Sequence, residues 1–105
     1  MQPTVTVLIL RFVRLTLDPS KREDFLTLFD GSSASIRAFD GCLELLLLQD
    51  TRYPNIFTTL SKWSSEDALN EYRSSPLFID TWARTKPMFA SPAVAFSYAV
   101  VRGPL

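Results

Sequence analysis

The sequence predicts an α+β domain with a four-stranded antiparallel sheet and a layer of helices, and three observations favour this class. Apolar, β-branched runs alternate with segments of helical periodicity in the order strand, helix, strand, strand, two short helices, strand. A turn-rich segment joins the middle strands as a hairpin. The chain has 105 residues and is 47% hydrophobic, enough for one core and too short for a second. We therefore assign residues 1–105 to one domain.

The first strand and first helix carry clear signals. Val5 to Leu17 is apolar on both faces, as in a strand that is covered on both sides. Asp18 and Pro19 then form a helix start, a capping side chain followed by proline. Apolar residues recur at spacings of three, four and seven until Gly41, which is expected to end the helix. Residues 31–33 favour helix poorly, and tertiary packing is expected to override that weakness.

The middle of the chain predicts a hairpin. Cys42 to Gln49 is a second strand, and the run of leucines within it leaves no polar face. Residues 50–55 contain the turn, and Ile56 to Trp63 is the returning strand.

The last third predicts two short helices and a final strand. Ser64 or Ser65 caps a helix, and Ser75-Pro76 starts another at a new angle that continues to Pro87. Ala93 to Val101 alternates large and small residues, which closes the chain as a strand. This order of elements is that of a split βαβ, or ferredoxin-like, sandwich.

The leucine-rich strands also predict a partner. Helices cover one face of such a sheet, yet the first two strands are apolar on both faces. Leaving several leucines and valines in water would cost several kcal/mol at ~25 cal/mol per Å², and exposed patches of that size usually mark an interface. A second copy of the chain, sheet against sheet, buries the same patch twice, so we expect a homodimer. A larger assembly would need apolar surface left over after dimerisation.

Composition excludes several function classes. Eleven basic and eleven acidic residues give zero net charge without a basic cluster, so no nucleic-acid partner is expected. No apolar run approaches the ~20 residues of a membrane span, and no charged leader precedes an apolar segment. Cys42 is the single cysteine, expected as a small buried hydrophobe in a cytoplasmic protein. The absence of histidine excludes a serine–histidine triad and imidazole metal or haem ligands, so any chemistry must use other groups.

The stretch from Trp63 to Trp82 gathers aromatic side chains on a strand end and two short helices, including Tyr72 and Phe78, an arrangement that builds a pocket. Together with the hairpin at residues 50–55, the Ser-Ser-Glu-Asp-Ala-Leu helix start and the Ser75-Pro76-Leu77-Phe78 segment, this stretch resembles the antibiotic biosynthesis monooxygenase (ABM) domain family. The resemblance covers nearly the whole chain. It implies a dimeric α+β barrel, and relatives include oxygenases of quinols and polyketide phenols that use no metal or flavin, haem-degrading enzymes, and members without an assigned reaction.

The resemblance assigns roles by position. Trp63 matches the family's strand-end tryptophan, which lines the pocket, and Tyr72 lies where many relatives have a histidine. Trp82 occupies the place of the axial histidine of haem-degrading members and cannot ligate iron. Thr59 and Leu69 stand where polyketide-type oxygenases use an asparagine and a tyrosine.

Each site residue has an ordinary structural alternative. Trp63 can be core, and Tyr72 can be a helix residue whose hydroxyl reaches solvent or a carbonyl rather than a donor to a bound phenolate. Phe78, Trp82 and Phe89 fit core or pocket wall.

Several charged residues also have two interpretations. Glu66 and Asp67 could be a pair of catalytic acids, but in the first turn of a helix they most simply complement its dipole. Arg84 and Lys86 end a helix, where they either attract an anionic substrate or complement its dipole. Glu44 and Arg11 point either to an edge or into an interface, and there they need a partner.

Two functional hypotheses remain. The first is a homodimeric monooxygenase without metal or flavin that acts on a small aromatic, quinol-like or polyphenol-like substrate. Trp63 and Tyr72 would be its catalytic residues, and Thr59, Leu69, Phe78, Trp82 and Arg84 would bind substrate. The second is a non-catalytic dimer that binds a small molecule or a protein on the same scaffold. Whether the structure has an enclosed cavity of a few hundred Å³ beside Trp63 or a pocket filled by side chains would discriminate the first hypothesis from the second.

Overall fold

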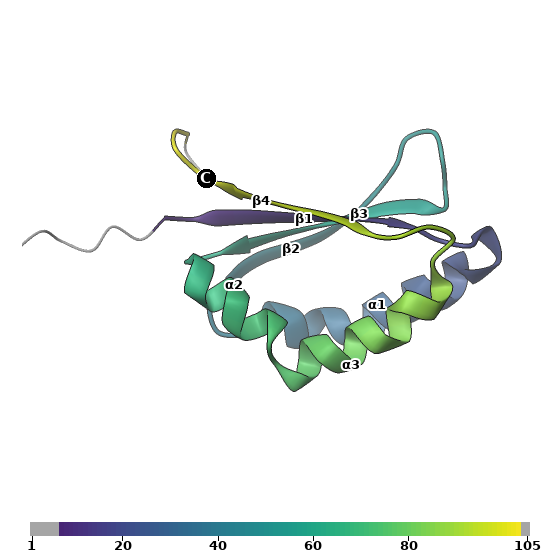
Figure 1. Cartoon of the computed structure of the whole chain (residues 1–105), viewed down its shortest axis with the longest axis horizontal. Coiled ribbons are helices and arrows are strands. Elements are labelled where there is room, and N and C mark those ends of the chain that lie inside the picture. Colours follow the sequence, from purple (N-terminus) through teal and green to yellow (C-terminus); the bar gives the residue numbers. More distant parts are fainter. Residues whose placement is uncertain (1–6, 104–105) are drawn as a thin grey trace, which may run out of the picture.

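The computed structural model describes residues 7–103. Four strands form one antiparallel sheet in the order β2-β3-β1-β4, and three helices cover one of its faces (Figure 1). The elements are β1 (Ile9–Thr16), α1 (Arg22–Arg37), β2 (Cys42–Gln49), β3 (Ile56–Trp63), α2 (Glu66–Arg73), α3 (Pro76–Thr85) and β4 (Val94–Ala99), with short 3₁₀ helices η1 (Pro19–Lys21) and η2 (Lys86–Met88). This arrangement confirms the α+β, ferredoxin-like class.

Element boundaries differ from the sequence prediction mainly at the ends. β1 begins at Ile9, and Val5, the predicted first residue, lies outside the described part of the chain. Asp18 is a cap as predicted, accepting from the Ser20 N–H at 2.9 Å, but it caps η1 rather than α1. α1 runs unbroken through residues 31–33 because its apolar stripe packs on the sheet.

α1 ends at Arg37 rather than at Gly41. The chain then makes a turn in which the Cys42 N–H donates to the Phe39 carbonyl at 2.9 Å, and Gly41 takes φ 88° to enter β2. β4 is shorter than the predicted 93–101, and α3 stops at Thr85, two residues before Pro87.

The inner face of the sheet carries the core. Cross-strand register places Leu15 opposite Phe57 and Ile9 opposite Trp63, so the side chains of each pair share a face. Two buried clusters follow, one around Leu15, Leu17, Phe25 and Phe57, the other around Ile9, Trp63 and Leu69. The helices close over both clusters and leave space between them for the site.

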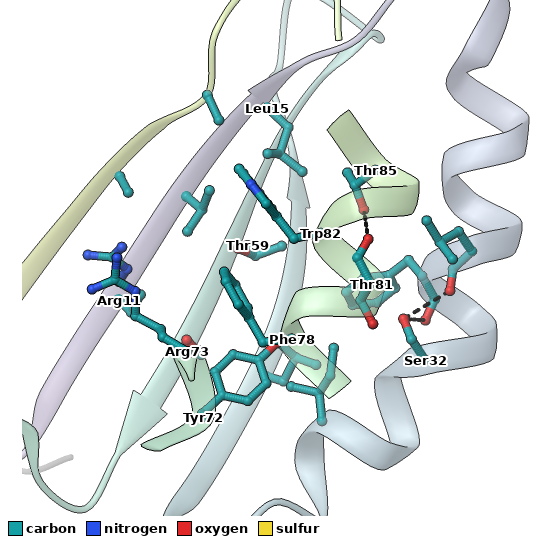
Figure 2. Close-up of a pocket in the computed structure, with 18 of the residues that line it drawn as sticks. Arg11, Leu15, Ser32, Thr59, Tyr72, Arg73, Phe78, Thr81, Trp82 and Thr85 are labelled. Atoms are coloured by element: carbon teal, nitrogen blue, oxygen red, sulfur yellow. Dashed lines mark hydrogen bonds between the residues drawn. The ribbon is translucent and has the colours of Figure 1, made fainter. Parts of the chain in front are cut away.

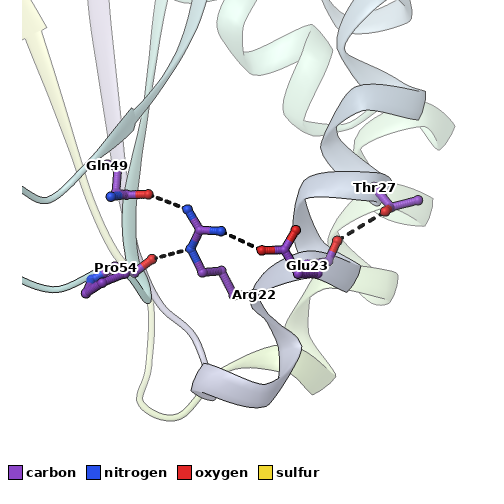
Figure 3. Close-up of polar contacts among 5 residues, drawn as sticks. All are labelled: Arg22, Glu23, Thr27, Gln49 and Pro54. Atoms are coloured by element: carbon purple, nitrogen blue, oxygen red, sulfur yellow. Dashed lines mark hydrogen bonds and ion pairs between the residues drawn. The ribbon is translucent and has the colours of Figure 1, made fainter.

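Arg22 joins the start of α1 to the β2–β3 hairpin (Figure 3). Its Nε donates to the Pro54 carbonyl at 2.9 Å and its Nη2 to Gln49 Oε1 at 2.5 Å, while its Nη1 pairs with Glu23 at 2.6 Å. The guanidinium also lies 5.4 Å from the centre of the Phe57 ring. These contacts hold one end of the helical layer against the sheet.

The outer face of the sheet is apolar and exposed within a single chain. Register aligns Phe96, Phe12, Leu60 and Leu46 across the four strands, and Phe96 is 48% and Leu46 42% exposed. Glu44 lies on this face and pairs with Lys62 at 3.7 Å. The carboxylate therefore has the partner that a charge in this position requires.

Within residues 7–103, no helix is long and apolar enough to cross a bilayer.

Candidate functional site

A cavity of about 340 Å³ lies between the inner face of the sheet and the three helices. Its walls come from all four strands and all three helices, and Figure 2 shows how the labelled side chains point into it. It has the few-hundred-Å³ size expected of a small-molecule site. The lining includes Arg11, Ser32, Thr59, Leu69, Tyr72, Arg73, Phe78, Trp82 and Thr85.

An unbroken row of aromatic rings forms one side of this region. Tyr72 stacks on Trp63 with ring centres 4.9 Å apart and meets Phe78 edge-on at 5.3 Å. Phe78 stacks on Trp82 at 5.9 Å, and Trp82 meets Phe89 at 5.5 Å. Rings arranged in this way offer flat, apolar faces to a planar ligand.

Two serine caps set the angle between the helices that carry these rings. Ser65 accepts from the Ala68 N–H at 3.1 Å and so starts α2. Ser75 accepts from the Phe78 N–H at 3.2 Å, and its own hydroxyl donates to the Tyr72 carbonyl at 2.6 Å. One serine therefore fixes the end of α2 against the start of α3, which holds Tyr72 and Phe78 in contact.

Tyr72 contributes a phenol hydroxyl to this row of aromatic rings. Burial, with a smaller contribution from Cys42 nearby, raises the pKa of its phenol from 10.0 to about 12. The hydroxyl makes no hydrogen bond to any other residue between 7 and 103. Tyr72 is therefore protonated at neutral pH and free to donate a hydrogen bond to a ligand.

Trp63 lies behind Tyr72 rather than in the cavity wall. Its side chain is fully buried, and its Nε1–H donates to the Ser61 hydroxyl at 2.9 Å. The predicted pocket-lining position is thus occupied by Tyr72, because α2 lays that ring flat over the indole. Trp63 supports the ring that faces the ligand.

The other predicted binding residues divide into two groups. Thr59, Leu69, Phe78 and Trp82 line the cavity. Arg84 does not, because it points outward on α3 and pairs with Asp80 at 3.2 Å, both side chains being more than 60% exposed. Its position one turn after Asp80 makes it an ordinary surface pair on a helix.

Two arginines that the sequence did not single out as site residues do line the cavity. Arg11 extends from the inner face of β1, and its Nη1 donates to Ser97 on β4 at 2.8 Å. Arg73, the last residue of α2, lies nearby (Figure 2), and burial together with the charge of Arg73 lowers the pKa of Arg11.

Two of the other polar side chains of the cavity are bonded within their own helices. Ser32 donates to the Leu28 carbonyl at 2.9 Å and Thr85 to the Thr81 carbonyl at 2.7 Å. The lining contains no carboxylate, and no group of three His, Cys, Asp or Glu suited to a metal occurs among residues 7–103. The described cavity thus offers donors and cations, with no carboxylate to act as a base.

Fold and site together define a small α+β sandwich with one aromatic cavity under its helices. The chain belongs to the antibiotic biosynthesis monooxygenase family, whose model matches residues 8–84. A search of curated proteins gives no significant match.

Solved structures of similar fold come from several organisms. A conserved protein of Methanosarcina mazei Go1 has a TM-score of 0.84 and 19% identity, covering 89% of this chain and 92% of that one. The protein Rv0793 of Mycobacterium tuberculosis has a TM-score of 0.84 and 22% identity, with 91% and 97% covered. A candidate antibiotic biosynthesis monooxygenase of Caulobacter crescentus CB15 has a TM-score of 0.86 and 22% identity, with 92% of each chain covered. At these identities the likeness concerns the fold.

Proposed function

We propose that this protein is a monooxygenase that uses neither metal nor flavin and acts on a small, electron-rich aromatic substrate such as a phenol or quinol. Family membership supports the reaction class. The observation that carries the substrate class is the protonated, unbonded Tyr72 hydroxyl set among stacked rings in a 340 Å³ cavity. Such a site holds a flat ring and offers one hydrogen bond to an oxygen on it.

The chemistry balances without an added reductant. The substrate binds as its phenolate, passes an electron to dioxygen, and the resulting pair combines into a peroxide at a ring carbon. The peroxide O–O bond then breaks, so that one oxygen stays on the ring and the other leaves as water with the phenolic and ring hydrogens. Phenol and dioxygen thus give a quinone and water. Tyr72 stabilises the substrate oxyanion throughout, which is electrostatic catalysis by a fixed donor.

We propose in addition that two chains pair through the outer sheet face. The aligned row of Phe96, Phe12, Leu60 and Leu46 is apolar, with Phe96 and Leu46 exposed and Phe12 and Leu60 half-buried, and apolar patches on a surface usually mark interfaces. In a two-fold dimer the same row would be buried on both chains. The single Cys42 supports a reducing, cytoplasmic location.

Oxygen uptake by metal-free protein tests the reaction. Naphthols, anthrones and quinols are supplied in turn, and the wild type should consume dioxygen with at least one of them. Tyr72→Phe should lower the rate by about 10- to 100-fold, since a hydrogen bond to a charged group contributes roughly 1.5–3 kcal/mol. Tyr53→Phe is the matched control, because Tyr53 lies on the hairpin turn and is 56% exposed.

Trp63→Phe should also slow the reaction, by loosening the support behind Tyr72. Unchanged uptake in both the Tyr72 and Trp63 variants would remove these assignments, and absence of uptake with every compound would remove the reaction.

A second function, binding without catalysis, is favoured by one specific observation. The cavity lining contains no carboxylate or imidazole to remove the phenolic proton. Saturable binding of an aromatic compound that never consumes oxygen would select this function over the first.

A further inference from the structure

Two like charges, the half-buried Arg11 and the exposed Arg73, line a cavity whose other lining residues are uncharged. Arg11 and Arg73 line it from β1 and from the end of α2, and no aspartate or glutamate shares the lining. The ion pairs within residues 7–103 involve other cations, so neither arginine has a carboxylate partner there. Figure 2 shows both on the opposite side of the pocket from Ser32 and Thr85.

This arrangement is unfavourable without an anion. Two guanidiniums near one another repel, and the repulsion grows where solvent is partly excluded. The pKa of Arg11 is lowered first by burial and then by Arg73, which reports that cost. The Ser97 hydroxyl offers one neutral acceptor at 2.8 Å. A guanidinium has five N–H donors, so most of those on the pair are left for a ligand.

The geometry points to a carboxylate-recognition site formed by Arg11 and Arg73, which selects aromatic carboxylates as the occupants of the cavity. This inference deepens the proposed function and rests on it for the identity of the cavity as the substrate site. Planar guanidiniums match a carboxylate with paired hydrogen bonds, and the rings of Tyr72, Phe78 and Trp82 supply the surface for the aromatic part. Fixing the carboxylate at one end would set which ring carbon lies beside Tyr72.

Calorimetric titration with naphthoate and its neutral isostere naphthamide tests this site directly. The two probes share size and ring system and differ in charge. The wild type should bind naphthoate at least tenfold more tightly, and this preference should weaken as salt is added. Arg11→Gln and Arg73→Gln should each reduce the preference severalfold, and the double variant should abolish it.

Two controls separate recognition from structure. Ser97→Ala removes the hydrogen bond to Arg11 and keeps the charge, so it should retain most of the preference. Arg84→Gln removes a cation outside the cavity and should leave the preference unchanged. Circular dichroism confirms that each variant is folded.

Equal affinity for the two probes, binding of neither, or a preference that survives the double variant would overturn the carboxylate site. Oxygen consumption is not part of this readout. Selective naphthoate binding without any oxygenase activity would therefore support the carboxylate site and refute the proposed reaction. Oxygen uptake with neutral phenols and no preference for naphthoate would support the reaction and refute the carboxylate site.

Discussion

Replacing Tyr72 by phenylalanine should change the alkaline stability of the protein in a calculable way. In the folded chain burial raises the pKa of Tyr72 to about 12, against 10.0 for an unperturbed phenol. Between these pH values the unfolded chain releases the proton and the folded chain keeps it. The unfolded state then binds fewer protons, so the free energy of unfolding falls as pH rises. The contribution is fully present below pH 10 and lost above about pH 12.

The size of this effect follows from the shift. Two pKa units correspond to at most about 2.7 kcal/mol, and the partial exposure of the ring reduces the expected value to about 1–2 kcal/mol. At neutral pH the substitution should cost under about 0.5 kcal/mol, because the hydroxyl makes no internal hydrogen bond to the described residues. As pH rises from 10 to 12, the wild type should therefore lose about 1–2 kcal/mol of unfolding free energy relative to Tyr72→Phe.

Urea unfolding at closely spaced alkaline pH values measures this difference. Ionisation of other groups affects both proteins alike and cancels in the comparison, and Tyr53→Phe, at an exposed turn position, shows what a phenol outside the core contributes. Parallel stability curves for wild type and Tyr72→Phe would refute the reasoning. Tyr72 would then titrate as a solvated phenol and could not be counted on as a buried donor.

Two further predictions concern the backbone and the outer sheet face. Gly41→Ala should destabilise the fold by about 2–4 kcal/mol in urea unfolding, because φ is 88° and a Cβ would stand 2.5 Å from the Cβ of Ala68. Gly31→Ala is the control: a Cβ there would have no other atom within 4 Å, so this variant should be more stable by about 0.5–1 kcal/mol. Equal effects of the two substitutions would contradict this reasoning. If two chains pair as proposed, the wild type should sediment as a dimer in analytical ultracentrifugation and Phe96→Glu as a monomer, because the new carboxylate would be buried without a partner. Tyr53→Glu should leave the dimer intact, and a wild-type monomer would refute the proposed pairing.

The fold could be predicted from the sequence because its signals are local. The hairpin strands were predicted with the bounds that the structure has, since turn residues delimit them on both sides. The errors fall where tertiary contacts decide an end. α1 ends at Arg37 rather than at Gly41, and the turn that follows takes up Ala38 to Asp40 and brings Gly41 close to Ala68 of α2. No local pattern in the sequence contains that contact.

The sequence also predicts which aromatic residues form the site, but it does not predict the order in which their rings pack. Tyr72, Phe78 and Trp82 line the cavity as predicted. Trp63 belongs to the same row but lies behind it, because whether a strand-end indole faces a cavity or a neighbouring ring depends on where the next helix lies. Only the packing of α2 on β3 decides this.

Sequence patterns do not predict which charged residues line the cavity. Alternation along the first strand places Arg11 on the same face as Ile9 and Val13, so its inward direction could have been inferred. Its partner could not, because Arg73 ends a helix more than sixty positions later and resembles the ordinary last-turn cation that complements a dipole. Arg84 has the same local setting and lies outside the cavity. Local sequence therefore cannot rank these two arginines, and only the position of each helix end relative to β1 separates a cation that lines the cavity from one outside it.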